Sequence, residues 1–469
     1  MTTQVVPSSS TAKPAGSVDF VASALAAFRE EGALLVVTVP APVAPLEALL
    51  GLDGSEDAIV WEPREGTAFA ALGAVATLVG RGHGRVEEVR AEAAELFARL
   101  RRVDAVDGAP GPRCFGGLAF EPGGAAETPW SSFGDARFVF PRLRYARGDG
   151  KAFLSLAVTK DESSSEARRA RLVALAESAL ARLRAAALGP ERRHGRTSPA
   201  VTDRREVSAA TYRDLVETAR SEVARGALEK VVVARRTELT FEAPPDPVAV
   251  LEELAEGALH CTRFSFRFGG ATFLGVSPER LVRRKGLELQ TEALAGSNRP
   301  GDPARAVELF ESPKERAEHA PVVREIVRTL GPLCSSLSHA PTPEVRTLRH
   351  VLHLRTPIVG HLSRPIHVLD LALRLHPTPA VGGVPAKESL RFIVEHEPVP
   401  RGWYASPVGW FDDNGDGEFF VALRSGAFVG DRAYLYAGGG IVRDSDPESE
   451  YEETRLKLAA LCTALRVAQ

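Results

Sequence analysis

Hydrophobic and polar positions along roughly the first 190 residues follow two periods, one typical of strands and one typical of helices. Short apolar runs bounded by polar residues predict strands at 33–39, 57–62, 138–146 and 152–160. Apolar residues at helical spacing predict amphipathic helices at 86–103 and 164–188. Gly148-Asp149-Gly150 separates the last two strands and predicts a hairpin. Ser164 or Ser165 is expected to cap the second helix.

A polar stretch at 189–205 interrupts this pattern. It contains two prolines and has no period, so it is expected to be a linker. Beyond it, strands are predicted at 228–241, 262–268, 271–276, 279–284, 287–292, 404–412, 417–425 and 428–437. Helices are predicted at 211–228, 303–310, 314–331 and 448–467. Helices mixed with largely antiparallel strands indicate the α+β class, and the Ser/Thr/Pro-rich residues 1–16 are expected to form a disordered tail.

The composition of the 469 residues excludes several classes of protein. With 44% apolar residues and a net charge of −3, the chain is typical of a globular protein and gives no reason to expect nucleic acid or an anionic membrane as partner. The four cysteines have no CxxC spacing and are expected to be reduced. No apolar run reaches about 18 residues, so no membrane span is expected. The N-terminus lacks the blocks of a signal peptide, so we expect a cytoplasmic protein.

Lysine is scarce, with eight among the 58 basic residues. We therefore expect a specific role for a lysine in an apolar strand more than we would in a lysine-rich protein. Lys230 opens the apolar run KVVVAR. A buried lysine has its charged form disfavoured and can act as a base. The alternative is a lysine at a strand end whose stem reaches solvent. The local sequence leaves both interpretations open.

Two predicted helices carry pairs of carboxylates near their starts. In the last helix, which Asp444 or Ser445 is expected to cap, Glu450 and Glu453 share a face with Lys457. Glu315 and Glu318 are spaced in the same way in the helix at 314–331. Such carboxylates can hold Mg²⁺ together with water and substrate oxygens. The alternative for both helices is a solvated face, and the absence of an HExxH motif beside His319 makes zinc unexpected.

Glycine-rich and histidine-containing segments add weaker signals. The run AGGGIV at 437–442 follows a predicted strand, and its backbone N–H groups can approach an anion, although it matches no nucleotide-binding motif. The run DDNGDGE at 412–418 resembles the start of a calcium loop but has Leu423 at position twelve, so it is expected to be a hairpin turn. His353 and His376 are placed near loops, where a packed histidine is the usual role.

Ten segments, taken in order, resemble the chorismate-utilising enzymes. They are KVVVAR (230–235), FLGVSPERL (273–281), TEALAGS (291–297), KERAEH (314–319), HLRTP (353–357), LHPTPAVGG (375–383), RGWYASPVGW (401–410), VALRSGA (421–427), AGGGIV (437–442) and SDPESEYEETRLKL (445–458). The resemblance covers residues 207–466 and includes isochorismate, salicylate, anthranilate and aminodeoxychorismate synthases. It implies one large α+β unit, two antiparallel sheets packed as a sandwich with helices outside. Residues 17–206 would be the N-terminal part of that unit, 207–469 the chorismate-binding catalytic region, and 189–205 a surface loop.

Within that family the chain resembles the isochorismate synthases, which add water at one ring carbon of chorismate while a hydroxyl leaves another. The lysine of the KVV strand is the general base in the water-using members, and Lys230 stands there, whereas amine-adding members have glutamine. The glutamate of the SPE motif is the general acid, which implies that role for Glu279. No amidotransferase subunit is then needed, and a monomer is expected.

The resemblance also implies a substrate and metal site. The Mg²⁺ ligands would be Glu318 and Glu453, with Glu315 and Glu450 helping through water. The substrate would be bound by Ser297, His353, Ala380, Arg424, Gly438, Gly439, Gly440 and Lys457. Of these, Ser297 and His353 would line the ring pocket, and Arg424, Lys457 and the glycine N–H groups would bind carboxylates.

Three positions bear on the details of this interpretation. Ala380 stands where salicylate synthases, the runner-up, tend to have threonine, which favours release of isochorismate without elimination of pyruvate. Gly439 replaces an alanine of many relatives and is expected to loosen its loop slightly. Pro321 is expected to kink the helix that carries Glu318. A non-catalytic chorismate-binding protein is the alternative of a different class.

Overall fold

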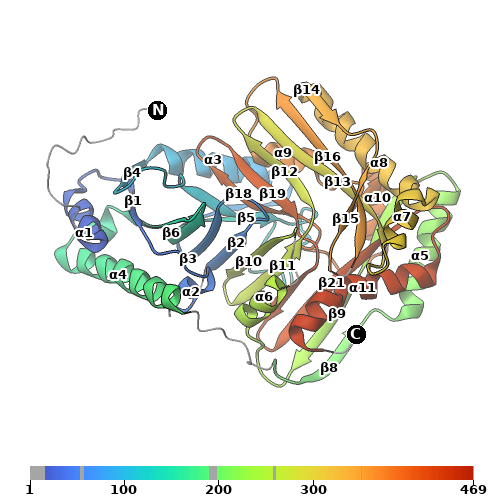
Figure 1. Cartoon of the computed structure of the whole chain (residues 1–469), viewed down its shortest axis with the longest axis horizontal. Coiled ribbons are helices and arrows are strands. Elements are labelled where there is room, and N and C mark those ends of the chain that lie inside the picture. The colour runs from blue at the N-terminus through green and yellow to red at the C-terminus, as the bar shows by residue number, and fades with distance from the viewer. Residues whose placement is uncertain (1–15, 53–56, 190–197, 257–259, 350, 468–469) are drawn as a thin grey trace.

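The computed structural model describes residues 16–52, 57–189, 198–256, 260–349 and 351–467. The predicted disordered tail, apart from Gly16, and residues 190–197 of the predicted linker lie outside the described residues. Within the described chain the helices and strands mix along the whole length (Figure 1), which confirms the α+β class.

One long run of strands spans the molecule from the N-terminal side to the C-terminal helix. Its order is β4 (Leu100–Asp104), β1 (Leu34–Pro40), β7 (Lys151–Thr159), β6 (Ala136–Gly148), β3 (Ala68–Gly80), β2 (Ala58–Glu62), β10 (Thr262–Phe268), β11 (Ala271–Ser277), β20 (Ser425–Val429), β21 (Arg432–Ile441) and β9 (Lys230–Phe241). The far side of β9 pairs with β8 (Val201–Glu206) and β17 (Gly383–Val384). Every pairing in this run is antiparallel except β1 with β4.

A second run of strands branches from β6. The C-terminal half of β6 pairs with β7, whereas its first four residues pair with β5 (Arg113–Leu118). From β5 the order continues through β18 (Pro407–Asp412), β19 (Gly417–Val421), β12 (Arg280–Lys285), β13 (Glu288–Asn298) and β16 (Leu352–Leu362), which also pairs with β14 (Cys334–His339) and β15 (Glu344–Thr347). The two predicted sheets are therefore continuous through the β3–β6 pair.

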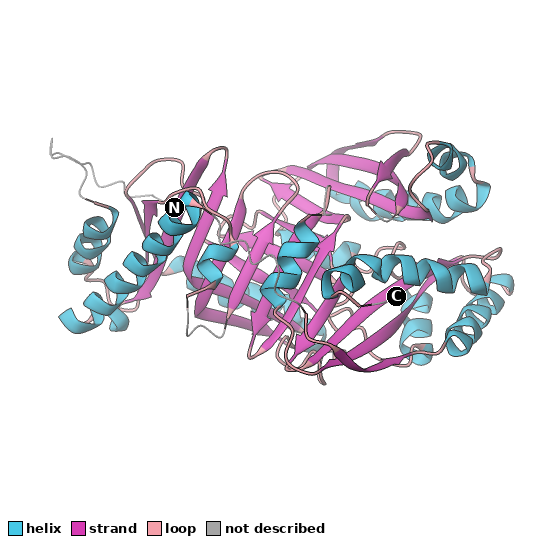
Figure 2. Ribbon diagram, turned by 60° about the horizontal axis from the view of Figure 1, so that its bottom comes forward, coloured by secondary structure: helices cyan, strands magenta, loops and turns pink. Residues whose placement is uncertain are grey.

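The two faces of the first run bury different cores. Phe266 and Phe273 point into a large core shared with the second run, while Leu274 and Val276 of β11 point to the opposite face. The opposite face is covered by α1 (Ser17–Ala27), α2 (Glu47–Leu50), α4 (Glu166–Leu188), α6 (Pro247–Ala255) and α11 (Pro447–Leu465). Strand alternation thus produces a layered molecule with helices outside (Figure 2).

The remaining helices pack their buried residues into the shared core. They are α3 (Arg85–Ala98), α5 (Ala209–Ala224), α8 (Pro313–Leu330), α9 (Val368–Leu375) and α10 (Ala386–His396), with α7 (Ala304–Glu311) next to α8. Short 3₁₀ helices cover Gly82–Gly84, Asp161–Ser163 and Gly331–Leu333. Ser165 caps α4 through the Arg168 N–H, as one of the two predicted caps.

Several predicted elements have different bounds. The helix predicted at 86–103 ends at Ala98, because the following residues form β4 beside β1. The strand predicted at 417–425 is divided between β19 and β20. Part of the predicted linker is β8, an edge strand on β9, and its exposed polar side chains explain why it lacks an apolar signal. The last helix is capped by Asp446, which accepts from the Ser449 N–H, and not by Asp444 or Ser445.

Strands far apart in the sequence pair across the middle of the molecule. β2 pairs with β10, and β5 pairs with β18. Beyond this centre the molecule divides into two arms: in Figure 1 the arm with β13, β14 and β16 lies at the upper right, and the arm with β9, β21 and α11 at the lower right. Residues of both arms line one pocket, which is the candidate site.

Candidate active site

The pocket between the two arms collects most of the residues that the sequence singled out. Its lining includes Glu279, Ser297, Glu318, His353, Ala380, Arg424, Gly438, Gly440 and Lys457. Lys230, Gly439, Glu315, Glu450 and Glu453 lie behind or beside this lining. Segments from nearly 230 residues of sequence therefore converge on one cavity.

Lys230 is the first residue of β9 and is completely buried. Its Nζ lies 3.0 Å from Oε1 of Glu318 and 3.4 Å from that residue's backbone oxygen. The alternative in which the lysine reaches solvent is therefore wrong. Gly440 makes room for this pair, because a Cβ there would lie 2.9 Å from Cε of Lys230 and 2.3 Å from Oε1 of Glu318.

Glu279 precedes β12 and is 2% exposed. Burial, and then the negative charge of Glu292, raise its pKa to about 8, although Lys230 acts in the opposite direction. Oγ1 of Thr378 donates to its Oε1 over 3.4 Å. Because the pKa lies above 7, the carboxyl group is mostly protonated at neutral pH and can donate a proton.

Four carboxylates from α8 and α11 approach each other beside the pocket. Burial, and then the neighbouring charge of Glu318, raise the pKa of Glu315 to about 7. Burial and then Glu453 raise the pKa of Glu450 to about 7. Burial acts to raise the pKa of Glu453 too, but Lys457 lowers it below its usual value. The part of each rise that comes from the neighbouring carboxylates is repulsion that a bound dication would relieve.

The solvated-face alternative is wrong for Glu450, which is 2% exposed. Its Oε1 lies 3.2 Å from Nζ of Lys314, and Lys457 lies 2.7 Å from Glu453. Among the residues that the structure describes, no three or more histidine, cysteine, aspartate or glutamate side chains are arranged to hold a metal ion by themselves. The four carboxylates fit Mg²⁺ only with water and substrate oxygens completing its shell, which is the usual way Mg²⁺ binds.

The pocket lining also includes a histidine and an arginine. His353 is the second residue of β16, next to the preceding loop as predicted, and lies directly opposite Ser297 of β13. Its Nδ1 donates to Gly296 O over 2.8 Å, so Nε2 accepts from Nη2 of Arg424 over 2.9 Å. Burial, and then Arg424, lower the pKa of His353 to about 3, so the ring is neutral. Within the described chain Arg424 makes no ion pair with a carboxylate, which leaves its charge for an anion.

The glycine run lies within β21, so its prediction as a loop is wrong. Nζ of Lys457 donates to Gly438 O over 2.8 Å, and Gly438 is opposite Ala234 of β9. In an antiparallel strand the N–H and C=O of one residue point the same way, so Gly438 and Gly440 direct their N–H groups away from β9. Gly439 directs its N–H group towards β9, which removes it from the predicted anion-binding set.

The expected loosening at Gly439 is also wrong, since the residue is held in a paired strand. A Cβ there would lie 2.8 Å from Oε2 of Glu450. Pro321 does not interrupt α8, which continues to Leu330. Ser297 lies where predicted: its N–H donates to Oε2 of Glu315 over 2.7 Å, which ties the pocket wall to the carboxylate group.

Other residues around the pocket were not singled out from the sequence. Arg401 donates to Val232 O and Val381 O over 2.9 and 2.6 Å and so joins β9 to the loop that carries Ala380. Tyr404 stacks on Tyr436, with ring centroids 5.2 Å apart. Lys314 could have been identified from the sequence, because lysine is scarce and this one lies in KERAEH, a segment that resembles the family. His376 is a packed histidine, as expected from the sequence, and its Nε2 lies 2.9 Å from Phe120 O.

Comparison with known proteins identifies the family to which this geometry belongs. The family model described as "Chorismate binding enzyme" matches residues 22–466, so the chain is a member of the chorismate-binding enzymes. None of the described helices is long and apolar enough to cross a membrane.

Relatives within the family carry more specific names. The chain is 38% identical to "Salicylate biosynthesis isochorismate synthase" of Pseudomonas aeruginosa, over 90% of this chain and 88% of that protein. It is 36% identical to "Isochorismate synthase MenF" of Bacillus subtilis, over 76% and 75%. The solved structure of MenF, "the Menaquinone-Specific Isochorismate Synthase from Escherichia Coli", matches with a TM-score of 0.78 and 29% identity, over 96% and 99%.

Proposed function

We propose that this chain is an isochorismate synthase, an isomerase that interconverts chorismate and isochorismate. The observation that carries the proposal is one pocket that is lined by Glu279, a buried glutamate just before β12 with a raised pKa, and has the buried Lys230 of β9 beside it. Relatives named isochorismate synthase, at 36–38% identity over most of the chain, support the same activity.

In the forward reaction Lys230 takes a proton from water as the water oxygen bonds to one ring carbon. The ring double bonds shift, the bond between another ring carbon and its hydroxyl breaks with its electron pair going to oxygen, and Glu279 gives its proton to that oxygen, which leaves as water. One water is consumed and one released, so substrate and product are isomers. In the reverse direction the two residues exchange roles.

The carboxylates of the substrate need positive partners inside the pocket. Arg424, Lys457 and the N–H groups of Gly438 and Gly440 supply these, because all four point to the pocket side of their elements. The neutral His353 ring fixes the direction of the Arg424 guanidinium through the 2.9 Å contact. Ser297 and Ala380 lie along the wall and limit the space for the ring.

We further propose Mg²⁺ as the cofactor, held by Glu318 and Glu453 with Glu315 and Glu450 acting through water. The repulsion between these carboxylates supports a dication at this place. When bound, Mg²⁺ supplies positive charge for the ring carboxylate of the substrate. Glu318 and Glu453 also contact Lys230 and Lys457, so the proposed metal ligands lie next to the proposed base and to a lysine that would bind substrate.

We also propose that the protein works in the cytoplasm as a monomer and without an amidotransferase subunit. Water as the nucleophile requires no source of ammonia, and Lys230 stands where the amine-adding relatives have glutamine. The cysteines Cys114, Cys261, Cys334 and Cys462 are all free thiols, which agrees with a reducing compartment.

Product analysis of the purified chain tests the proposal. Incubation with chorismate and Mg²⁺, without ammonia or a second protein, should give isochorismate at equilibrium with chorismate, and incubation with isochorismate should give the same mixture. Chromatography of the products measures both, with a chelator-treated sample as control. Salicylate and pyruvate as the only products would instead identify a salicylate synthase. No turnover would favour a chorismate-binding protein without catalysis.

A further inference from the structure

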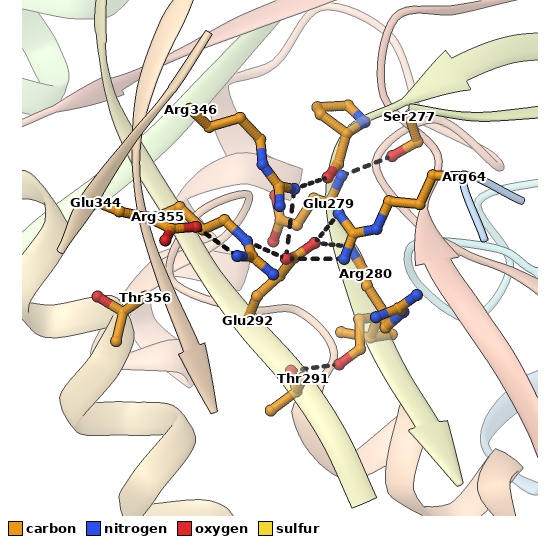
Figure 3. Close-up of polar contacts among 12 residues, drawn as sticks. Arg64, Ser277, Glu279, Arg280, Thr291, Glu292, Glu344, Arg346, Arg355 and Thr356 are labelled. Carbon is orange, nitrogen blue, oxygen red and sulfur yellow. Dashed lines mark hydrogen bonds and ion pairs between the residues drawn. The ribbon is translucent and has the colours of Figure 1, made fainter. Parts of the chain in front are cut away.

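Glu292 is a buried carboxylate beside the pocket that has no role in the chemistry described so far. It lies in β13, and its side chain is 1% exposed. Its two oxygens accept five hydrogen bonds (Figure 3). Arg64 donates through both Nη atoms at 3.1 Å, Arg355 through Nε at 2.6 Å and Arg346 through Nη1 at 3.4 Å. The fifth donor is the backbone N–H of Arg280, at 2.9 Å.

The last of these contacts places Glu292 against the chain that carries Glu279. Arg280 directly follows Glu279, so its N–H bond to Glu292 fixes the peptide on that side. On the other side Nη1 of Arg346, which also contacts Glu292, donates to Pro278 O over 3.3 Å. The two peptides that flank Glu279 are therefore held by one cluster of charges (Figure 3).

The backbone of Glu279 itself is held from the neighbouring strands. Its N–H donates to Oγ of Ser277 over 3.3 Å, and its C=O accepts from the Val421 N–H over 3.1 Å. With both flanking peptides and its own backbone bonded, Glu279 has little freedom except at its side-chain torsions. A carboxyl group must be held in this way if it is to reach one particular substrate oxygen.

We propose that Glu292, together with its arginines, is a positioning residue that fixes Glu279 towards the pocket and maintains it as a proton donor. The inference rests on the proposed role of Glu279 as the acid. Glu292 lies in β13 but does not line the pocket, so the proposed role is indirect and acts through Glu279. It also brings the N-terminal part of the chain into the site, because Arg64 lies between β2 and β3.

Electrostatics agrees with this arrangement. Burial acts to raise the pKa of Glu292, but Arg64, Arg346 and Arg355 lower it to about 2, so Glu292 is charged throughout the working pH range. Its charge then opposes ionisation of Glu279. The other groups that face Glu279 are Lys230 of β9 and Lys457 of α11, whose charges favour ionisation, and the hydroxyl of Thr378. After burial, which raises the pKa of Glu279 most, Glu292 is thus the charged neighbour that favours its protonated form.

Two substitutions separate this role from a general contribution to stability. Glu292→Gln retains an oxygen for the Arg280 N–H but removes the charge, so the pKa of Glu279 should fall by about one unit. Arg346→Met removes a cation from the same cluster, so the pKa of Glu279 should stay or rise. Glu288→Gln, an exposed glutamate on the same strand, is the matched control and should leave it unchanged. A general loss of stability would not shift the pKa of Glu279 in a direction that depends on the sign of the charge removed.

The measurement is a ¹³C NMR titration of the Glu279 carboxyl carbon in the full-length protein, assigned by its disappearance in Glu279→Gln. Thermal unfolding of each variant checks that it is folded. An unchanged titration in Glu292→Gln, or an equal fall in Arg346→Met, would overturn the inference. If Glu292→Gln does not fold, Glu292→Asp replaces it: the charge is kept but the reach is shortened, and the inference requires a raised or unchanged pKa together with a lower kcat.

Turnover assays then distinguish this inference from the proposed function. In Glu292→Gln, kcat/KM should fall at a lower pH than in the unmodified protein. The difference in pH should equal the change in the pKa of Glu279 measured by NMR. If the titration shifts while Glu279→Gln remains fully active, the positioning contact exists but Glu279 is not the acid. If the titration does not shift while Glu279→Gln is inactive, the acid assignment holds and the inference about Glu292 is wrong.

Discussion

Two glutamates at the site show how far surroundings can separate identical side chains. Glu279, with its charged neighbours at a distance, has a pKa of about 8, and Glu292, in contact with three arginines, has one of about 2. The SPE motif identified Glu279 from sequence. Glu292 could not be identified in the same way, because Arg64, Arg346 and Arg355 are brought to it only by the sheet.

At the same scale, the proposed base can be tested directly. Lys230→Ala should lower kcat by roughly 10²- to 10⁴-fold, the range of general acid–base catalysis, because β9 has no other lysine that could take the proton. Chorismate binding, measured by calorimetry, should persist since Arg424 and Lys457 remain. Lys285→Ala, at the exposed end of β12, is the control and should be fully active. Equal activity in both variants would remove Lys230 from the base role.

At the scale of elements, α8 and α11 are built alike where they meet the pocket. Each begins with proline after a capping side chain, Ser312 or Asp446, and each carries its carboxylates in the first two turns. Those signals are local, so the sequence located both helices closely. It misplaced the glycine run as a loop, because a strand without side chains has no apolar alternation, and only pairing with β9 reveals it.

The metal assignment belongs to these two helices. Glu453→Gln should raise the Mg²⁺ concentration needed for half-maximal activity by on the order of tenfold or more, since one negative ligand is lost. The measurement is a Mg²⁺ titration of initial rates at saturating chorismate. The control is Glu452→Gln, the adjacent residue, whose carboxylate pairs with Arg455 at the surface. Identical titrations of the two variants would contradict Glu453 as a ligand.

At the scale of the whole molecule, the pairings β2–β10 and β5–β18 join residues 17–206 to 207–469. Most strands and helices could be located from their periodicity, but these pairings could not. The linker prediction at 189–205 is wrong from Val201 onwards for that reason: β8 pairs with β9, and nothing local to the segment indicates its partner. The family resemblance implied two packed antiparallel sheets but no order of strands, which comes from the structure.

We expect the chain to unfold as one unit, with the shared core as its centre. Phe266 is completely buried there, 6.0 Å from the Trp403 ring centroid. Phe266→Ala should lower the free energy of unfolding by about 3–5 kcal/mol, in a single urea transition seen alike by tryptophan fluorescence and circular dichroism. Val307→Ala, at an exposed site on α7, should change it by no more than about 0.5 kcal/mol. Two separate transitions would show that the two parts fold independently.

The same strand pairings leave strand edges exposed while the chain is being synthesised. When β2 and β5 have been made, their partner strands are still about 200 and 290 residues away in the sequence. At roughly 5–20 residues per second, the newly made edges wait between about 10 and 60 s for β10 and β18. Open edges of that kind pair readily with other chains. The exposed edges of β2 and β5 are therefore a place where the first half of the nascent chain is open to pairing with other chains, whatever the stability of the finished protein.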